Sequence, residues 1–151
     1  MPHEIRPLSA ALPGTWELLS RTDVNDAGEP RKEPSLGTDP IALLIYDRSG
    51  HFSAQFMKRD RTVSTVFDAP TAGSNNTRAQ GGYDAYFGTY AIDDAAGTVT
   101  QRLAGALSAE SVGLEITREM KVDDDHLIIG LRTTSIMGEE VTRTLTWKRV
   151  G

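Results

Sequence analysis

The chain contains no cysteine among its 151 residues, and this absence removes several chemistries together. Without a thiol there is no disulfide, no thiolate nucleophile and no cysteine-ligated zinc. The longest continuous apolar run, residues 41–46, is much shorter than the roughly 20 residues of a membrane-spanning helix. The N-terminal residues also lack the basic start and apolar stretch of a secretion signal. We therefore expect a soluble, cytoplasmic protein without a membrane partner.

Positive charge and metal-binding side chains are scarce as well. The chain has 16 Lys and Arg against 21 Asp and Glu, and its most basic segment, residues 58–61, is interrupted by an aspartate. The formal net charge of -5 argues against a nucleic-acid partner. The three histidines His3, His51 and His126 are scattered, and no phosphate-binding glycine loop or dinucleotide fingerprint occurs. We expect no metal site and no cofactor.

The chain does contain short alternating segments separated by turn residues, with no sustained helical period. Gly and Asp recur where a tight reversal needs a positive φ or a side chain that bonds its own backbone. The alternation predicts strands at 14–22, 41–47, 50–57, 62–67, 83–93, 97–107, 111–122, 126–133 and 140–149. The length fits a single domain over residues 1–151. We predict an all-β fold, a closed antiparallel barrel of eight or nine strands with at most a short helix, whose interior can hold one small molecule.

Two long segments lack this alternation. Residues 23–40 contain three prolines and mixed charges, and we expect them to lie against the outside of the barrel. Residues 68–82 are rich in small and polar side chains, and a loop of that length in a compact domain is usually functional or disordered. The second segment is open to two interpretations, a mobile lid over the barrel mouth or a solvated loop.

Strand parity identifies polar side chains that point into the barrel. Alternate residues of a strand face opposite sides, so a polar residue on the apolar parity is buried. By this argument Arg118, Arg143, Gln101 and Ser20 face inward. Their apolar companions are Val112, Leu114, Ile116, Met120, Val141, Leu145, Trp147, Val99, Leu103, Leu107, Trp16 and Leu18.

Two further strands complete this interpretation. Segment 50–57 places Phe52, Ala54 and Phe56 inside and its polar parity, which begins at His51, outside. Segment 83–93 is ambiguous, because its inward set of Tyr86, Tyr90 and Ile92 shares a face with Asp84.

An inward arginine keeps its proton and is costly to bury alone, so it needs a partner. Arg118 and Arg143 could form structural ion pairs with Asp84, Glu115 or Glu119, or be turned to solvent by bulges. Alternatively they bind a carboxylate, enolate or carbonyl oxygen of a ligand in an otherwise apolar pocket. Both interpretations remain open at the level of the sequence.

Four motifs in order carry a family resemblance. They are GTWELLS at 14–20, LIYDRSG at 44–50 continuing into SAQ at 53–55, AYFGTY at 85–90 and GTVT at 97–100. Together they resemble bacterial lipocalin-like domain proteins of the calycin superfamily over nearly the whole chain. The resemblance implies that Trp16 closes one end of the barrel and that Arg149 or Lys148 stacks across it. Relatives often carry histidines after the last motif, where this chain has Gln101 and Arg102, so histidine acid/base chemistry is not expected there.

The candidate catalytic residues are Arg118, Arg143 and Tyr86, and the candidate substrate-binding residues are Gln101, Tyr90, Phe52, Phe56, Leu114, Ile116, Met120 and Ser20. The hypothesis they support is a cofactor-free cyclase or isomerase acting on a hydrophobic, oxygenated, polyketide-like small molecule. The alternative is a non-catalytic carrier or sensor of such a molecule. A barrel filled by its own side chains, acting only as an interaction module, is a third interpretation. Barrels of this size often dimerise through an outer face, so a homodimer is also considered.

Overall fold

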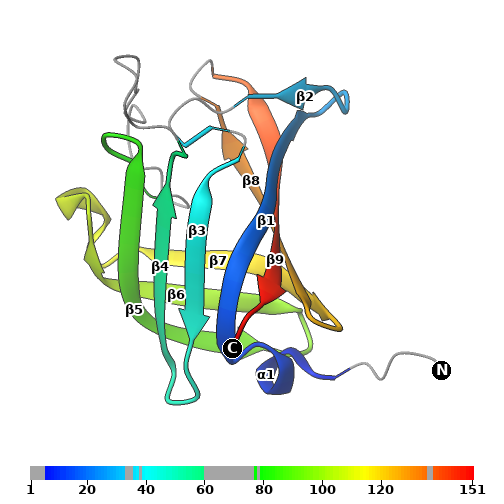
Figure 1. Ribbon diagram of the computed structural model, residues 1–151, viewed down its shortest axis with the longest axis vertical. Helices are drawn as coiled ribbons and strands as arrows, with labels where there is room; N and C mark the ends of the chain where they lie inside the picture. Colours follow the sequence, from blue (N-terminus) through cyan, green and yellow to red (C-terminus); the bar gives the residue numbers. More distant parts are fainter. Residues whose placement is uncertain (1–5, 33–35, 38, 60–76, 78, 136–137) are drawn as a thin grey trace.

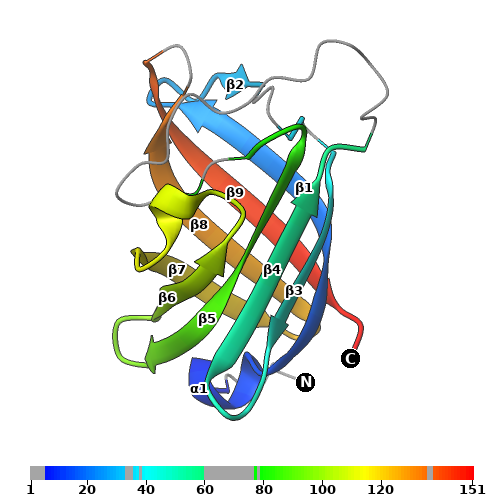
Figure 2. The same ribbon diagram turned by 90° about the vertical axis from the view of Figure 1, so that its left-hand side faces the viewer.

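The computed structural model describes residues 6–32, 36–37, 39–59, 77, 79–135 and 138–151, and these form an antiparallel β-barrel (Figures 1 and 2). Its strands are β1 (Gly14–Asn25), β2 (Pro30–Arg31), β3 (Ile41–Tyr46), β4 (His51–Met57), β5 (Tyr83–Asp93), β6 (Thr98–Ala106), β7 (Glu115–Asp123), β8 (His126–Thr134) and β9 (Glu140–Arg149). The sheet order is β1-β3-β4-β5-β6-β7-β8-β9, and β9 pairs with β1. The predicted closed barrel is therefore confirmed, with β2 as an extra strand on β1.

Local chemistry explains the turns that the sequence predicted. Between β3 and β4, Asp47 Oδ1 accepts hydrogen bonds from the backbone N–H groups of Ser49 and His51, each at 2.9 Å. Gly50 then takes a φ of 95°, which costs little without a Cβ atom. This turn sets the register in which Phe52 and Phe56 of β4 face the core, as predicted.

The strand predictions differ from the structure in two places, apart from one segment that the structure does not describe. The predicted strand 62–67 lies outside the described residues. Strand β2 was not predicted. The predicted strand 111–122 is wrong at its start, because the 3-10 turn η1 (Ala109–Ser111) and Gly113, at a φ of 88°, precede β7. Val112 is consequently 52% exposed instead of facing inward.

Two β-bulges reverse the parity of side chains within a strand. In β1 the pairing with β9 shifts between Leu18 and Ser20, so Ser20 is exposed while Arg21 and Asp23 are buried. In the β5–β6 pair the register shifts next to Gly88, and Leu107 beyond the shift is 43% exposed. A bulge inserts one extra residue, and one residue is enough to move every later side chain to the other face. The prediction that Ser20 and Leu107 face inward is therefore wrong.

The short helix α1 (Leu8–Ala11) lies at one end of the barrel, and we call this end the floor (Figure 1). Trp16 is fully buried, and its indole N–H donates to the carbonyl of Leu12 at 3.0 Å. The guanidinium carbon of Arg149 lies 4.3 Å from the centre of the Trp16 ring. Arg149 also donates hydrogen bonds to the backbone carbonyls of Pro13 and Ala11. The stacking of Arg149 on Trp16, which the resemblance implied, is thus confirmed.

Candidate functional site

A cavity lies inside the barrel, between the floor and the end that carries β2. Its water-accessible volume is about 60 Å³. A single water needs roughly 10–15 Å³ of such space, so the cavity has room for several waters or one small organic molecule. Most of its wall is apolar and comes from Leu44, Phe56, Met120, Ile129, Leu145 and Trp147. A cavity of this kind is suited to a hydrophobic small molecule.

Four of the predicted polar residues line this cavity, namely Arg118, Gln101, Tyr86 and Arg143. Arg118 of β7 is 8% exposed, Gln101 of β6 is 4% exposed, and Tyr86 of β5 lies on the same wall. The amide nitrogen of Gln101 donates to the hydroxyl oxygen of Tyr46 at 2.5 Å, which holds the Gln101 side chain in place. Burial lowers the pKa of Arg118. An anion beside this guanidinium would relieve that cost.

The buried hydroxyls of Tyr86, on the cavity wall, and of Tyr46, which is not among the lining residues, remain protonated at neutral pH. Burial, and secondarily the charge of Asp84, raises the pKa of Tyr86 well above its ordinary value. Burial likewise raises the pKa of Tyr46. A phenol that keeps its proton can donate to a ligand oxygen.

Trp147 of β9 presents a donor that the parity argument treated only as apolar surface. Its ring lines the cavity, is fully buried and packs edge-on against Phe56, with ring centres 5.7 Å apart. Its indole N–H has no hydrogen-bond partner among the described residues. A buried donor without a partner costs about 1–3 kcal/mol, so an acceptor on a bound molecule would be favourable there.

Arg143 also reaches the cavity wall, but it is held by a different carboxylate from those the sequence suggested. Its Nε and Nη2 donate to Asp23 Oδ1 and Oδ2 at 2.8 and 2.9 Å. The Arg143 and Asp23 side chains are only 8% and 4% exposed. The expected partners Asp84, Glu115 and Glu119 do not form this pair, because the bulge in β1 turns Asp23 inward.

Two charged cavity residues, Arg21 and Asp84, were not among the predicted site residues. Asp84 is 6% exposed and accepts a hydrogen bond from the hydroxyl of Thr77. Burial raises the pKa of Asp84, although the bonds from Thr77 and from the Ala85 backbone and the charge of Arg21 oppose it. The shared parity of Asp84 and Tyr86 was visible in the sequence, whereas Arg21 was hidden by the bulge.

The remaining predicted residues divide into three groups. Phe56 and Met120 line the cavity. Phe52 and Ile116 are buried in the core but are not part of the cavity wall. Leu114 is half-buried and packs against the same core. Tyr90 and Ser20 lie elsewhere, since the hydroxyl of Tyr90 donates to the backbone of Asp47 and Ser20 is exposed.

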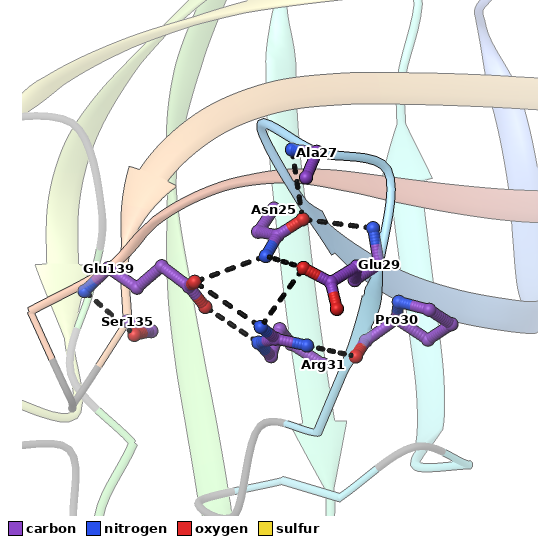
Figure 3. Close-up of polar contacts among 7 residues, drawn as sticks. All are labelled: Asn25, Ala27, Glu29, Pro30, Arg31, Ser135 and Glu139. Atoms are coloured by element: carbon purple, nitrogen blue, oxygen red, sulfur yellow. Dashed lines mark hydrogen bonds and ion pairs between the residues drawn. The ribbon is translucent and has the colours of Figure 1, made fainter.

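A polar network at the rim joins the β1–β2 turn to the β8–β9 turn (Figure 3). Arg31 Nε donates to Glu139 Oε1 at 2.7 Å, and the amide of Asn25 donates to Glu139 Oε2 at 3.1 Å. Leu36, a few residues after β2, is 6% exposed and lines the cavity. The expectation that residues 23–40 lie only against the outside is therefore wrong, because apolar burial draws Leu36 over the cavity. The predicted lid lies mostly outside the described residues.

The described residues offer neither a metal-binding cluster nor a membrane-spanning helix. Within the part of the chain that the structure describes, no group of three or more His, Asp or Glu residues could hold a metal ion. Neither α1 nor any other helix in the described ranges is long and apolar enough to cross a membrane.

A family model described as a lipocalin-like domain matches residues 13–150. No curated protein matches the chain. The match begins just before the floor tryptophan and ends just after its stacking arginine, so it includes the whole barrel. The chain therefore belongs to the lipocalin-like domain family.

Proposed function

We propose that the cavity binds a small, largely apolar molecule that carries an anionic or carbonyl oxygen. The observation that carries the proposal is that Trp147, a residue of the cavity wall, has a buried indole N–H without a hydrogen-bond partner among the described residues. Arg118 and the protonated hydroxyl of Tyr86 add donors to the same wall. A wall of donors in an apolar surround favours an acceptor oxygen on the ligand.

The balance of buried charge supports an anion. The buried charged side chains of the described residues are Arg21, Arg118 and Arg143 against Asp23 and Asp84. Among the described residues, these three positive and two negative groups leave an excess of one positive charge when all five are ionised. A ligand carboxylate or enolate would place a negative charge beside these arginines, and the planar fork of an arginine fits two oxygens of one group.

The same donors would support a cofactor-free isomerisation or cyclisation. Such a reaction rearranges bonds within one molecule and develops negative charge on a carbonyl oxygen. Arg118 and Tyr86 would stabilise that charge in a site with little water, where electrostatic interactions are strong. The cavity volume of about 60 Å³ favours a small substrate, or one end of a longer polyketide-like substrate.

A non-catalytic carrier or sensor is the second candidate. It is favoured by the composition of the wall, where Asp84 is the one carboxyl and no histidine occurs among the described lining residues. Binding would then use the same donors without proton transfer to carbon.

Extraction of bound molecules tests the binding proposal. The wild-type protein should retain a compound with an acidic or carbonyl oxygen in native mass spectrometry, and Arg118→Met and Trp147→Phe should lose it. Arg102→Met, which removes an exposed arginine of β6, is the matched control and should keep the compound. Retention of the compound at wild-type affinity by both cavity variants would refute the proposed site.

The extracted compound then separates the enzyme from the carrier. It is incubated with fresh protein and followed by NMR. An isomer or cyclised product that forms with the wild type and not with Arg118→Met supports the enzyme. Unchanged recovery of the compound supports the carrier.

A further inference from the structure

The cavity in which we propose that a ligand with an anionic oxygen binds also contains a carboxyl group. Asp84 lies on β5 two residues before Tyr86, is 6% exposed and shares the cavity wall with Arg118. The whole cavity offers about 60 Å³ of water-accessible volume. A ligand anion in so small a space lies near the Asp84 carboxyl, and two negative charges at short range in a poorly solvated site repel strongly.

The groups around Asp84 come from several strands. Thr77 donates to its Oδ2, and Arg21 is the cation whose charge acts on its pKa. Burial outweighs both and raises the pKa of Asp84. The other charged or titratable groups of the described cavity wall are Arg118 on β7, Tyr86 on β5 and Arg143 on β9, which is paired with Asp23. His51 and His126 lie outside the cavity wall.

We propose that the cavity takes up its anionic ligand together with one proton, and that Asp84 carries this proton. The inference rests on the proposed function. The proton comes from solvent, so the combined uptake of ligand and proton is electrically neutral. The neutral carboxyl then donates its O–H to a ligand oxygen, as a second anchor beside Arg118. The ligand class is accordingly a monoanion with acceptor oxygens, such as a carboxylate or an enolate.

This linkage has a definite direction with pH. The ligand favours the protonated form of Asp84, so binding raises the pKa of Asp84 and acid strengthens binding. Above the pKa of Asp84 in the free protein, the dissociation constant rises by up to about tenfold per pH unit. Below that pKa the proton is already bound, and the affinity becomes constant.

The probe is propane-1-sulfonate, which is anionic at every pH tested, with the neutral propane-1-sulfonamide as its matched control ligand. Dissociation constants are measured by NMR titration between about pH 5 and pH 8 for the wild type and Asp84→Asn. Asp123→Asn, which changes an exposed carboxylate of β7, is the control variant. The wild type and Asp123→Asn should lose sulfonate affinity as the pH rises. Asp84→Asn should bind sulfonate independently of pH. The affinity for sulfonamide should not vary with pH in the wild type or in either variant.

A second measurement needs no variant. The ¹³C resonance of the Asp84 carboxyl in the wild type should titrate at a higher pH with propane-1-sulfonate than without it. An unchanged midpoint, or sulfonate affinity that is flat with pH in the wild type, overturns the proton-linked inference and leaves the proposed function standing. Sulfonate that fails to bind, or binds equally well to Arg118→Met, overturns the proposed function and the inference with it.

Discussion

Separating Asp23 from Arg143 should cost the protein several kcal/mol of unfolding free energy, because water hardly reaches this ion pair. The pair is bidentate, with N–O distances of 2.8 and 2.9 Å. The exposed fractions of the Arg143 and Asp23 side chains are 8% and 4%. Removing either partner leaves the other charge buried without compensation.

The magnitude follows from that burial. Arg143→Met alone or Asp23→Leu alone should each lower the unfolding free energy by about 3–5 kcal/mol. The double variant puts two apolar side chains in the same space and should be close to the wild type, because neither charge has to be desolvated. Two losses of about 3–5 kcal/mol against a double variant near zero give a coupling energy of about 6–10 kcal/mol, comparable with the whole 5–15 kcal/mol of a typical domain.

Urea unfolding followed by tryptophan fluorescence measures the four unfolding free energies. The control cycle uses Arg132 and Asp26, which are also 2.9 Å apart but are 55% and 65% exposed. The exposed pair should couple by no more than about 1 kcal/mol. If the Asp23–Arg143 coupling is as small as that of the exposed pair, the argument from burial is wrong.

The remaining predictions concern the floor and the two bulges. Trp16→Ala should cost about 3–5 kcal/mol of unfolding free energy, as a truncation of a fully buried ring, and a loss below about 1 kcal/mol in urea unfolding would contradict its role in closing the barrel. Gly88→Ala should destabilise by about 1–3 kcal/mol or more, because its Cβ would lie 1.8 Å from the Arg102 carbonyl oxygen, whereas Gly130→Ala, with nothing within 4 Å of its Cβ, should change the melting temperature little. Deleting Leu19 should remove the bulge in β1 and turn the side chain of Asp23 outward, so the protein should lose as much stability as when the Asp23–Arg143 ion pair is broken. The control Leu19→Ala, at a position that is 50% exposed, should change the unfolding free energy by less than about 0.5 kcal/mol. Equal stability of the deletion and the wild type in urea would show that the bulge does not set the parity.

Much of the fold was accessible from the sequence, because alternation and turn chemistry are local properties. The predicted bounds of 83–93 and 140–149 agree with β5 and β9. The inward directions of Arg118 and Gln101 were predictable because β6 and β7 pair without a register shift through these residues. The dimer, the single-domain organisation, the ligand and its reaction stay predictions.

The charged part of the site was only partly accessible. Strand parity predicts that Arg118, Arg143 and Gln101 face the interior and leaves Tyr86 ambiguous, and the structure brings all four to one cavity. Arg21 and Asp23 were missed, because a bulge follows from how β1 pairs with β9 and leaves no mark within β1 itself. Strand parity predicts that Trp147 faces inward. It does not predict that the indole N–H has no hydrogen-bond partner among the described residues, because that depends on all the side chains around it.

The amino-acid sequence alone determined the barrel and most of its strands, since these depend on side-chain periodicity and on residues adjacent in the chain. The family resemblance of the same sequence indicated the tryptophan that closes the barrel. Tertiary structure decided the charge pattern of the cavity, because that pattern depends on which strands meet and in what register. One extra residue in β1 leaves Ser20 exposed and turns Arg21 and Asp23 into the barrel, where Asp23 pairs with Arg143. Pairing between β1 and β9, whose residues are more than a hundred positions apart, is a contact that no local pattern records.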